Sequence, residues 1–499
     1  MTDQRQRTIS RRTVLGGIGT GIVAGFAGCT GGGNGSDETA TTGSDGTTST
    51  GGETTSGGGG TTASGSGVSS QQLDYWLFGG APAEREYISS HYDEYGEHEI
   101  SYQHQEWGQK YQIIASAAAN SNLPDVMAGQ GQQIPDYVDA SAIQPLNQDA
   151  FADRIEAMNE PYIEANLDTL RFSGLGEYDE EMQWAMPGGY ADLGPFIDIR
   201  TEYLEQTSFD GPPRTWEEFL QLAQEMQELD EVSAAVTTSG TDFGLTTGYF
   251  IGWVYANGGR YFDPDSLEAT VDGPGFVDAV KLYQDIAEAG LFPDSVAEND
   301  HIAAGRLLTE GESGIFITYS HTGGVYDTIG ADQSFLDGNG HITTRAPLPK
   351  SPSGDFEPQN LLLQNATAQM MARGTANDNE QQAAFDYIEW WSQPEQLAPW
   401  TYTQDADVGI RGRIPTLKSA FENPSDIFRN QYSDVLTLYE NDNLFDQTSR
   451  FPSFSGLSSV QSEINTQVLQ PVMLGNATAE EACSGVNSAI QEIIDENMG

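Results

Sequence analysis

The segment HEISYQH begins and ends with a histidine, and these two residues are the first whose spacing could suit the binding of a metal ion. The segment superficially resembles a zinc-protease helix, but His98 and His104 are six positions apart. They cannot share a helical face in the way that two zinc ligands four positions apart do. On a strand both side chains would point to the same side, which would suit a metal ion but also fits an ordinary strand face. We therefore predict a strand without a metal site.

Signatures of catalysis are otherwise missing from the sequence. It has no Gly-Lys-Ser/Thr of a phosphate-binding loop, and beyond residue 70 it has no Gly-x-Ser-x-Gly turn for a nucleophilic serine. The segment DPDSLEATVDG spaces its acids like a calcium loop but lacks the central glycine and the closing glutamate, so we predict a turn. Carboxylate pairs are inevitable among 74 acidic residues and do not indicate a glycosidase. We predict a protein that is not an enzyme and has no cofactor.

The net charge limits the classes of partner. The chain carries 21 basic and 74 acidic residues, a formal net charge of −53, which excludes nucleic acids and anionic lipids by repulsion. Hydrophobic residues make up 37% of the chain and aromatic residues 10%, which is enough for a packed core and argues against a disordered acidic protein. Because concentrated salt screens such self-repulsion, we expect a halophilic source of haloarchaeal type.

The N-terminus has the composition of an export signal. Arg11 and Arg12 precede an uncharged run, residues 14–28, of about fifteen residues, which is shorter than the roughly 20 apolar residues of a membrane-spanning helix. The arginine pair resembles a twin-arginine signal, and the end of the run resembles a lipobox in which Cys29 is lipidated. A marginal anchor helix with a chance arginine pair would also fit. Either interpretation places the body of the protein outside the cytoplasm, tethered to a membrane.

Residues 30–70 are almost wholly glycine, serine and threonine and lack any apolar periodicity. Such a composition cannot form a core, so we predict a disordered linker after a signal at residues 1–29. A flexible chain of about 40 residues has an r.m.s. span of roughly 35 Å, which would leave the body mobile beside its membrane. The chain has two cysteines, Cys29 and Cys483. If Cys29 is lipidated, Cys483 has no second thiol to pair with, and no disulfide can form within the chain.

The residues from 71 onward are too many for one hydrophobic core and predict two lobes. We expect a first strand at residues 73–78, a helix at 84–95, and strands at HEISYQHQ and LPDVMAG with a helix between them. Strands that alternate with helices indicate βαβ units and a mainly parallel sheet. Periodicity further predicts helices at residues 215–229, 275–289 and 379–392 and a strand at 314–319.

Several segments, taken in order, resemble one protein family. They are DYWLFGG, EWGQKYQIIASAAANSNLPDVMAG, ASAIQPLNQ, MQWAMPGGYADLGPFIDIRTEYLEQTSFDGPPRTWEEFLQLAQEM, YANGGRYFDPDS, LLTEGESGIFITYSHTGG, RAPLPK, AAFDYIEWWSQPEQ and QPVMLGNATAEEACSGVNSAIQEI. Over residues 73–498 they resemble extracellular solute-binding protein family 1 of ABC importers, the sugar-binding group that includes maltose-binding proteins. The Pro-x-Thr-Trp-x-Glu-Phe segment is the most specific match, and in it Thr215 fits an N-cap with Glu218 as its capping-box partner. The segment IDIR departs from the Tyr-Asn that the family usually has in its crossing strand.

The resemblance implies a two-lobed α/β fold of the periplasmic-binding-protein (type II) class, whose lobes are joined by a hinge of crossing strands. It assigns residues 71–190 and about 346–405 to lobe I, and residues 191–345 and about 406–499 to lobe II. It also implies a sugar or oligosaccharide captured in an interlobe cleft, closure of the lobes over it, and delivery to ABC permease subunits. The expected protein is a monomer, anchored through Cys29 at the extracellular face of the cytoplasmic membrane.

A sugar site needs aromatic platforms for the CH faces and fixed polar groups for the hydroxyls. Where the family's motifs match, the resemblance implies a ligand-binding role for Phe78, Gly79, Gln130, Gln132, Tyr190, Asp192, Tyr249, Trp253, Tyr319, His321 and Phe454. Tyr319 and His321 follow the GIFI strand, where the family commonly presents a stacking aromatic residue. Trp253 and Phe454 would also fit a hydrophobic core.

Alternative functions stay open at this point. The same fold could bind a polyamine, a peptide or glycerol phosphate; Asp192 would suit a polyamine, whereas the loops lack the clustered Arg or Lys that a phosphate would favour. A secreted hydrolase should turn over chromogenic glycosides. A surface adhesin or structural lipoprotein should show no lobe closure with any small solute.

Overall fold

The parallel strands expected near the start of the chain form the centre of a mixed sheet. The computed structural model describes residues 70–498 except 81, 149, 242, 321–324, 327, 332–341, 348–360, 366, 375–376, 402–413, 425, 432–435, 437–438 and 441–447. In it, β1 (Gln72–Phe78) pairs in parallel with β2 (Glu99–Gln105) and with β3 (Val126–Gly129). Antiparallel β13 (Ala368–Ala372) and β4 (Ile143–Gln144) complete the order β2-β1-β3-β13-β4. The predicted βαβ arrangement is confirmed for β1, β2 and β3, but the expectation of a mainly parallel sheet is wrong, because β13 and β4 pair antiparallel.

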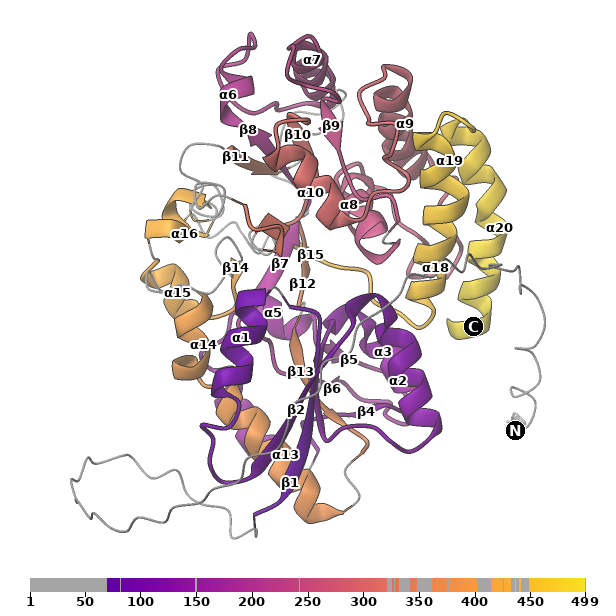
Figure 1. Ribbon diagram of the computed structural model, residues 1–499. Helices are drawn as coiled ribbons and strands as arrows, with labels where there is room; N and C mark the ends of the chain where they lie inside the picture. Colours follow the sequence, from indigo (N-terminus) through magenta and orange to yellow (C-terminus); the bar gives the residue numbers. More distant parts are fainter. Residues whose placement is uncertain are drawn as a thin grey trace, which may run out of the picture. The chain divides into compact units, whose positions relative to one another are not determined.

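This sheet is covered on both faces, and we call it and its helices lobe I (Figure 1). Its other elements are α1 (Pro82–His91), η1 (Trp107–Gln109), α2 (Lys110–Ala119), η2 (Gly131–Gln133), α3 (Ile134–Asp139), α4 (Ala152–Asn159), α5 (Glu164–Asp168), β5 (Arg171–Phe172), β6 (Met182–Gln183), α13 (Asp378–Trp391) and α14 (Pro394–Thr401). Leu73, Tyr75 and Leu77 of β1 pack with α1, α4 and α13, whereas Trp76 and Phe78 pack with α2 and α3. Successive strand residues point to opposite faces, so a strand buried on both faces reads as the continuous apolar run seen in the sequence.

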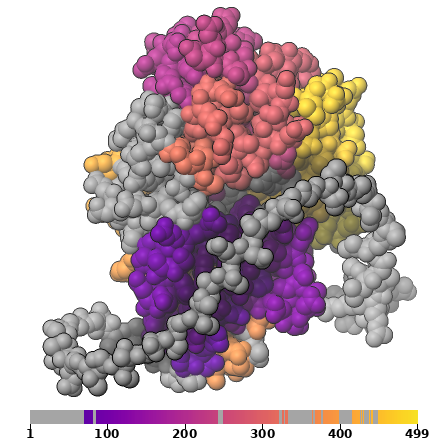
Figure 2. Space-filling model, in the orientation of Figure 1, coloured from indigo at the N-terminus to yellow at the C-terminus, as the bar shows by residue number. Residues whose placement is uncertain are grey.

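Lobe II is built around a second sheet of order β11-β8-β10-β9. Its elements are β8 (Phe196–Arg200), α6 (Thr201–Leu204), α7 (Trp216–Gln227), β9 (Val236–Thr237), α8 (Phe243–Ala256), α9 (Pro274–Glu288), α10 (His301–Thr309), β10 (Ile315–Thr318), β11 (Ile342–Pro347), α18 (Leu457–Glu463), the π-helical η3 (Ile464–Leu469), α19 (Gln470–Met473) and α20 (Ala479–Met498). One large hydrophobic cluster joins these helices to the sheet. In the space-filling view, the magenta, salmon and yellow segments of lobe II lie together above the indigo and purple ones of lobe I (Figure 2).

The helices predicted at residues 215–229, 275–289 and 379–392 are confirmed as α7, α9 and α13. The expected start of α7 is confirmed as well, because the Glu218 amide donates to the Thr215 hydroxyl at 3.1 Å. The Glu218 carboxylate accepts from the amide of Arg214 at 2.6 Å, one residue before the N-cap. The capping box therefore closes one residue earlier than its usual form. Within the described residues, no helix combines the length and the apolar character that a membrane span needs.

Crossing strands connect the two lobes. They form a sheet of order β14-β7-β12-β15, made of β7 (Tyr190–Gly194), β12 (Leu361–Gln364), β14 (Ile414–Pro415) and β15 (Thr448–Arg450). Beside it, α15 (Lys418–Glu422) and α16 (Asp426–Gln431) contribute to a smaller hydrophobic cluster with β7. Every residue from 190 to 200 is buried, so β7 and β8 are one extended run interrupted only by Pro195. The same run therefore belongs to the crossing sheet at one end and to the lobe II sheet at the other.

Close approaches at glycine positions hold the middle of this run. A Cβ on Gly194 would lie 1.7 Å from the Tyr319 ring, and one on Gly252 of α8 would lie 2.1 Å from Pro195. Backbone hydrogen bonds add to this contact, because the Ser320 amide donates to the Leu193 carbonyl at 3.0 Å. The Leu193 amide in turn donates to the Ser320 hydroxyl at 2.8 Å. The crossing run is therefore packed directly against the end of β10 and against α8.

A carboxylate also ties the two central strands of lobe I. Asp125, just before β3, accepts from the Asp74 amide at 2.8 Å and donates its own amide to the Asp74 carbonyl at 2.9 Å. Burial raises the pKa of Asp125 to about 6, and the nearby charges of Asp74 and Glu380 act in the same direction. The charged form of this residue is therefore less favourable in the folded chain than in the unfolded chain.

We expect Asp125→Asn to stabilise the protein at about pH 8, by about 1 kcal/mol once partial contact with solvent is allowed for. The raised pKa means that the wild type takes up a proton on folding between about pH 4 and pH 6. The charged Asp125 carboxylate therefore lowers the free energy of unfolding above that pH window, and the protonated carboxyl group does not lower it below the window. Denaturant unfolding of both chains at about pH 8 and about pH 4 measures the difference. The exposed Asp179→Asn serves as a control with little effect at either pH. A loss of stability at both pH values would contradict this reading of Asp125.

We expect Gly194→Ala to lower the free energy of unfolding by about 1–3 kcal/mol, because the new methyl group would overlap the Tyr319 ring. The matched control is Gly211→Ala, since a Cβ there meets no atom of the described residues within 4 Å. Thermal unfolding of the two variants makes the comparison. The contact between Gly194 and Tyr319 is refuted if both variants unfold at the temperature of the wild type.

Candidate functional site

The carboxyl ends of β1 and β3 meet at one edge of the lobe I sheet, since the two strands are parallel neighbours. Such an edge is where open α/β sheets bind ligands. Phe78 is the last residue of β1, but its side chain is fully buried in the lobe I core beside Trp76. It therefore packs beneath the edge of the sheet. Gly79 follows with a φ of 77°, and a Cβ there would lie 2.7 Å from the Trp107 ring. Gly79 is therefore needed for the turn that leaves the strand.

The two histidines of HEISYQH have separate structural roles. His104 lies in β2, and its Nε2 donates to the Gly79 carbonyl at 3.0 Å, which fixes the loop after β1. His98 precedes β2, and its Nδ1 accepts from the Gln71 amide at 3.3 Å. Within the residues that the structure describes, no group of three or more His, Cys, Asp or Glu side chains could hold a metal ion. In the calcium-like segment, Asp263 accepts from the amides of Asp265 and Ser266 at 2.9 Å each, which confirms the predicted turn.

The loop after β3 places buried amide oxygens at the same edge. Gln130 and Gln132 are 5% and 6% exposed, and neither Oε1 atom finds a hydrogen-bond partner among the described residues. The loop is fixed by the Gly131 amide, which donates to the Asn365 carbonyl at 2.8 Å. Buried acceptors are normally paired with protein, water or ligand. These two oxygens can therefore accept from the hydroxyl groups of a bound solute.

Sequence reasoning missed a second set of polar residues beside this loop. Asn365 and Thr367 lie where β13 begins, because Ala368 pairs with Gly129 at the end of β3. Both are nearly fully buried, and Asn365 Oδ1 and Thr367 Oγ1 have no hydrogen-bond partner in the described part of the chain. The signal available in the sequence was the polar segment NAT between the apolar runs LLL and AQMMA. A polar segment between two apolar runs is as typical of a ligand-binding edge of a sheet as it is of a turn.

A second group of predicted residues lies along the crossing run. Tyr190 and Asp192 belong to β7 and are buried, and Asp192 pairs in register with Gln364 of β12. Tyr319 directly follows β10; its hydroxyl donates to the Gly248 carbonyl, and its ring meets that of Tyr249 edge-on with centroids 5.3 Å apart. Burial raises the pKa of Tyr319 well above its ordinary value, with the Asp192 charge acting in the same direction. The structure thus brings Asp192, Tyr249 and Tyr319 together.

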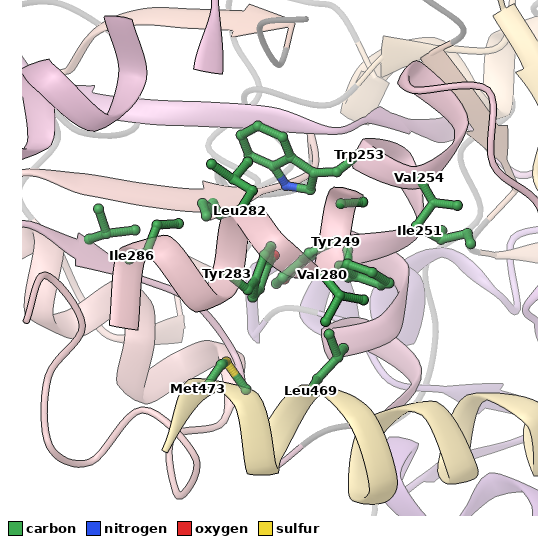
Figure 3. Close-up of a cluster of buried hydrophobic side chains, with 14 of the residues drawn as sticks. Tyr249, Ile251, Trp253, Val254, Val280, Leu282, Tyr283, Ile286, Leu469 and Met473 are labelled. Atoms are coloured by element: carbon green, nitrogen blue, oxygen red, sulfur yellow. The ribbon is translucent and has the colours of Figure 1, made fainter. Parts of the chain in front are cut away.

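Two other predicted residues lie in the lobe II core. Trp253 is fully buried against Trp216 and Phe219, with ring centroids 5.8 and 5.6 Å apart. Figure 3 shows Trp253 in one cluster with Tyr249 and Tyr283, while Leu469 and Met473 approach from the yellow helix. Phe454 packs edge-on against Phe262 at 4.9 Å. These contacts give Trp253 and Phe454 a packing role, which was the alternative interpretation of both residues.

The two groups are linked through β12, because Asp192 pairs with Gln364 and the carbonyl of the next residue, Asn365, accepts from the Gly131 amide. A further segment joins them at residue 453. The Ser453 hydroxyl donates to the Gln132 carbonyl, which brings the segment of Phe454 beside the loop of Gln130 and Gln132. The site therefore draws on the lobe I edge, the crossing run and this segment. The predicted residues His321, Cys29, Arg11 and Arg12 lie outside the described residues.

Comparison with known proteins gives a family and a fold. The family profile described as bacterial extracellular solute-binding protein matches residues 90–430, which is more than half of the chain. No protein among curated sequences matches the chain.

Solved structures of similar fold include maltose-bound MalE3 of T. maritima, with a TM-score of 0.69 and 16% identity over 85% of this chain and 100% of that chain. The GacH receptor of Streptomyces glaucescens, solved unliganded and with acarbose, has a TM-score of 0.67 and 17% identity over 86% of this chain and 99% of that chain. A sugar transporter of Arthrobacter chlorophenolicus with bound laminaribiose has a TM-score of 0.66 and 18% identity over 84% of this chain and 99% of that chain.

At these identities the likeness establishes the fold and not the ligand. Both the solved structures and the two sheets joined by crossing strands agree with the expected two-lobed α/β fold. The family profile covers the loop after β3, the crossing run and the end of β10, whereas Phe78, Gly79 and Phe454 lie outside the matched residues. The chain belongs to the family of bacterial extracellular solute-binding proteins.

Proposed function

We propose that the chain captures a sugar or oligosaccharide between its two lobes and delivers it to the permease of an ABC importer. The observation that carries this proposal is the gathering at the lobe I edge of buried oxygens that have no hydrogen-bond partner within the described residues. Gln130, Gln132, Asn365 and Thr367 each bring one such atom to the place where β3 ends and β13 begins. A ligand that donates several hydrogen bonds without carrying charge suits these oxygens, and sugar hydroxyls do so.

Aromatic surfaces near the crossing run support the same ligand. Tyr249 and Tyr319 lie near Asp192 and Gly194. Both are fully buried, so they would form the inner wall of the cleft, where such rings match the CH faces of a sugar. The similar structures include complexes with maltose, acarbose and laminaribiose. Binding then consists of a population shift, because a solute that touches both lobes favours the closed form.

The cellular setting of the proposal comes from the sequence. The twin-arginine pair Arg11-Arg12, the lipobox ending at Cys29 and the flexible linker of residues 30–70 would hold the body at the outer face of the membrane, within reach of its permease. No turnover of the solute is expected, since the permease and its ATPase subunits would drive import. The protein would act as a monomer from a halophilic cell.

A polyamine is the second candidate ligand. Asp192 is a buried carboxylate beside the tyrosines, and a cationic amine would be attracted by it and by aromatic faces. The two candidates differ in what they need at the lobe I edge, because a protonated amine interacts mainly with Asp192 and the aromatic rings. A sugar uses the oxygens of Gln130 and Gln132 as well.

A thermal-shift screen in molar salt tests the proposal, with mono- and oligosaccharides, glycerol phosphate, polyamines and peptides. A ligand at 100 times its Kd should stabilise the chain by about 2.7 kcal/mol. We expect a shift with a sugar, and we expect Gln132→Ala to weaken that sugar's affinity about fivefold because one hydrogen bond is lost.

The matched control is Gln112→Ala, because Gln112 is an exposed glutamine on α2. It should leave the shift unchanged. A response to polyamines alone would replace the sugar with the second candidate. The absence of any response would contradict the proposal and favour an adhesin, and turnover of chromogenic glycosides would favour a hydrolase.

A further inference from the structure

Two neighbouring hydrogen bonds join the loop after β3 to the segment before α18. The Ser453 hydroxyl donates to the Gln132 carbonyl, and the Gly456 amide donates to Asp136 Oδ1 at 2.9 Å. Asp136 lies on α3, whose Tyr137 and Val138 belong to the lobe I core. Leu457, which follows Gly456, belongs to the lobe II core. Both bonds therefore run from one lobe to the other.

The donor side is held rigidly by lobe II. Gly456 has a φ of 87°, in the left-handed region that favours glycine. A Cβ at this position would lie 2.9 Å from Asn497 and 3.1 Å from Ile493, both on α20. The Gly456 amide is thus fixed by close packing against the last helix and cannot follow Asp136 if lobe I moves away.

The acceptor side is held by lobe I. Tyr137, next to Asp136, is fully buried, and its hydroxyl donates to Gln133 Oε1 at 3.0 Å. Burial raises the pKa of Asp136, while Gly456 and Ser458 act against that shift by stabilising the carboxylate. Asp139 on the same helix is the charged group that also bears on it among the described residues. Asp136 therefore acts on lobe II through one well-placed acceptor oxygen and not through a pair of opposite charges.

We propose that Asp136 is a positioning residue for lobe closure: its acceptor oxygen holds residues 453–458 of lobe II against the loop that carries Gln130 and Gln132. This inference rests on the proposed function, because it assigns to the contact the retention of a ligand bound beside that loop. Asp136 lies four residues after Gln132, so its contact with lobe II holds the lobes together close to the bound solute. We therefore expect the contact to change the dissociation rate of the solute more than its association rate. An amide oxygen at the same position can accept the same bond, so asparagine should replace the aspartate.

The test uses the full mature chain and maltotriose as the probe, with the dissociation rate measured by stopped-flow tryptophan fluorescence. We expect Asp136→Ala to release maltotriose about tenfold faster, in line with the loss of a hydrogen bond to a charged group. Asp136→Asn should stay within about threefold of the wild type, because it keeps the acceptor. Asp139→Ala, on the exposed side of the same helix, is the matched control and should not change the rate.

Hydrogen exchange at residues 453–458, without ligand, separates this inference from the proposed function. If maltotriose does not bind the wild type, the sugar proposal fails for this probe, while the exchange still reports the contact. We expect faster exchange in Asp136→Ala and in Ser453→Ala, but not in Asp139→Ala. Should Asp136→Ala fail to fold, Ser453→Ala tests the neighbouring bond. The inference is overturned if Asp136→Ala exchanges like the wild type, or if Asp136→Asn is as impaired as Asp136→Ala.

Discussion

The crossing run of residues 190–200 is the constraint on which the rest of the structure depends. All of its residues are buried, and it contributes β7 to the crossing sheet and β8 to the lobe II sheet with only Pro195 between them. Neither sheet can be repacked without disturbing the other, because Gly194 lies against Tyr319 and Pro195 lies against Gly252. A close-packed interior transmits such shifts instead of absorbing them. The relative position of the two lobes is therefore linked to side chains that also line the candidate site.

The candidate site follows from this arrangement. Parallel β1 and β3 end at one edge of lobe I, and the antiparallel β13 begins there, so three chain segments bring polar groups to one place. The crossing run leads from that region to Tyr319 and Tyr249 in lobe II. The return of the chain through β15 then brings Arg450 over the Phe172 ring, with its guanidinium carbon 4.0 Å from the ring centroid. Ser453 and Gly456 follow and contact lobe I again. The segment that leads into α18 is thereby held close to the loop of Gln130 and Gln132.

Much of the fold could be predicted from local signals. The apolar run of β1, the N-cap Thr215 and the periodicity of α9 and α13 depend on residues that are neighbours in sequence, and all are confirmed. The site was harder to predict because it depends on contacts across the chain. Aromatic residues mark a core as often as a ligand surface, and Trp253 shows why: its ring completes a cluster with Trp216 and Phe219. The polar NAT segment marks Asn365 and Thr367 in the sequence, but their place at the site comes from β13 pairing with β3, and that local segment does not indicate this pairing.

The measurement that tests the central claim most directly is the radius of gyration of the chain in solution. It would be measured by small-angle X-ray scattering in molar salt, with and without the sugar that gives the largest thermal shift. A solute held between two lobes favours the closed form, so the account predicts a smaller radius when the sugar is saturating. An unchanged radius at saturation would mean that the sugar binds without joining the lobes, and it would contradict the account.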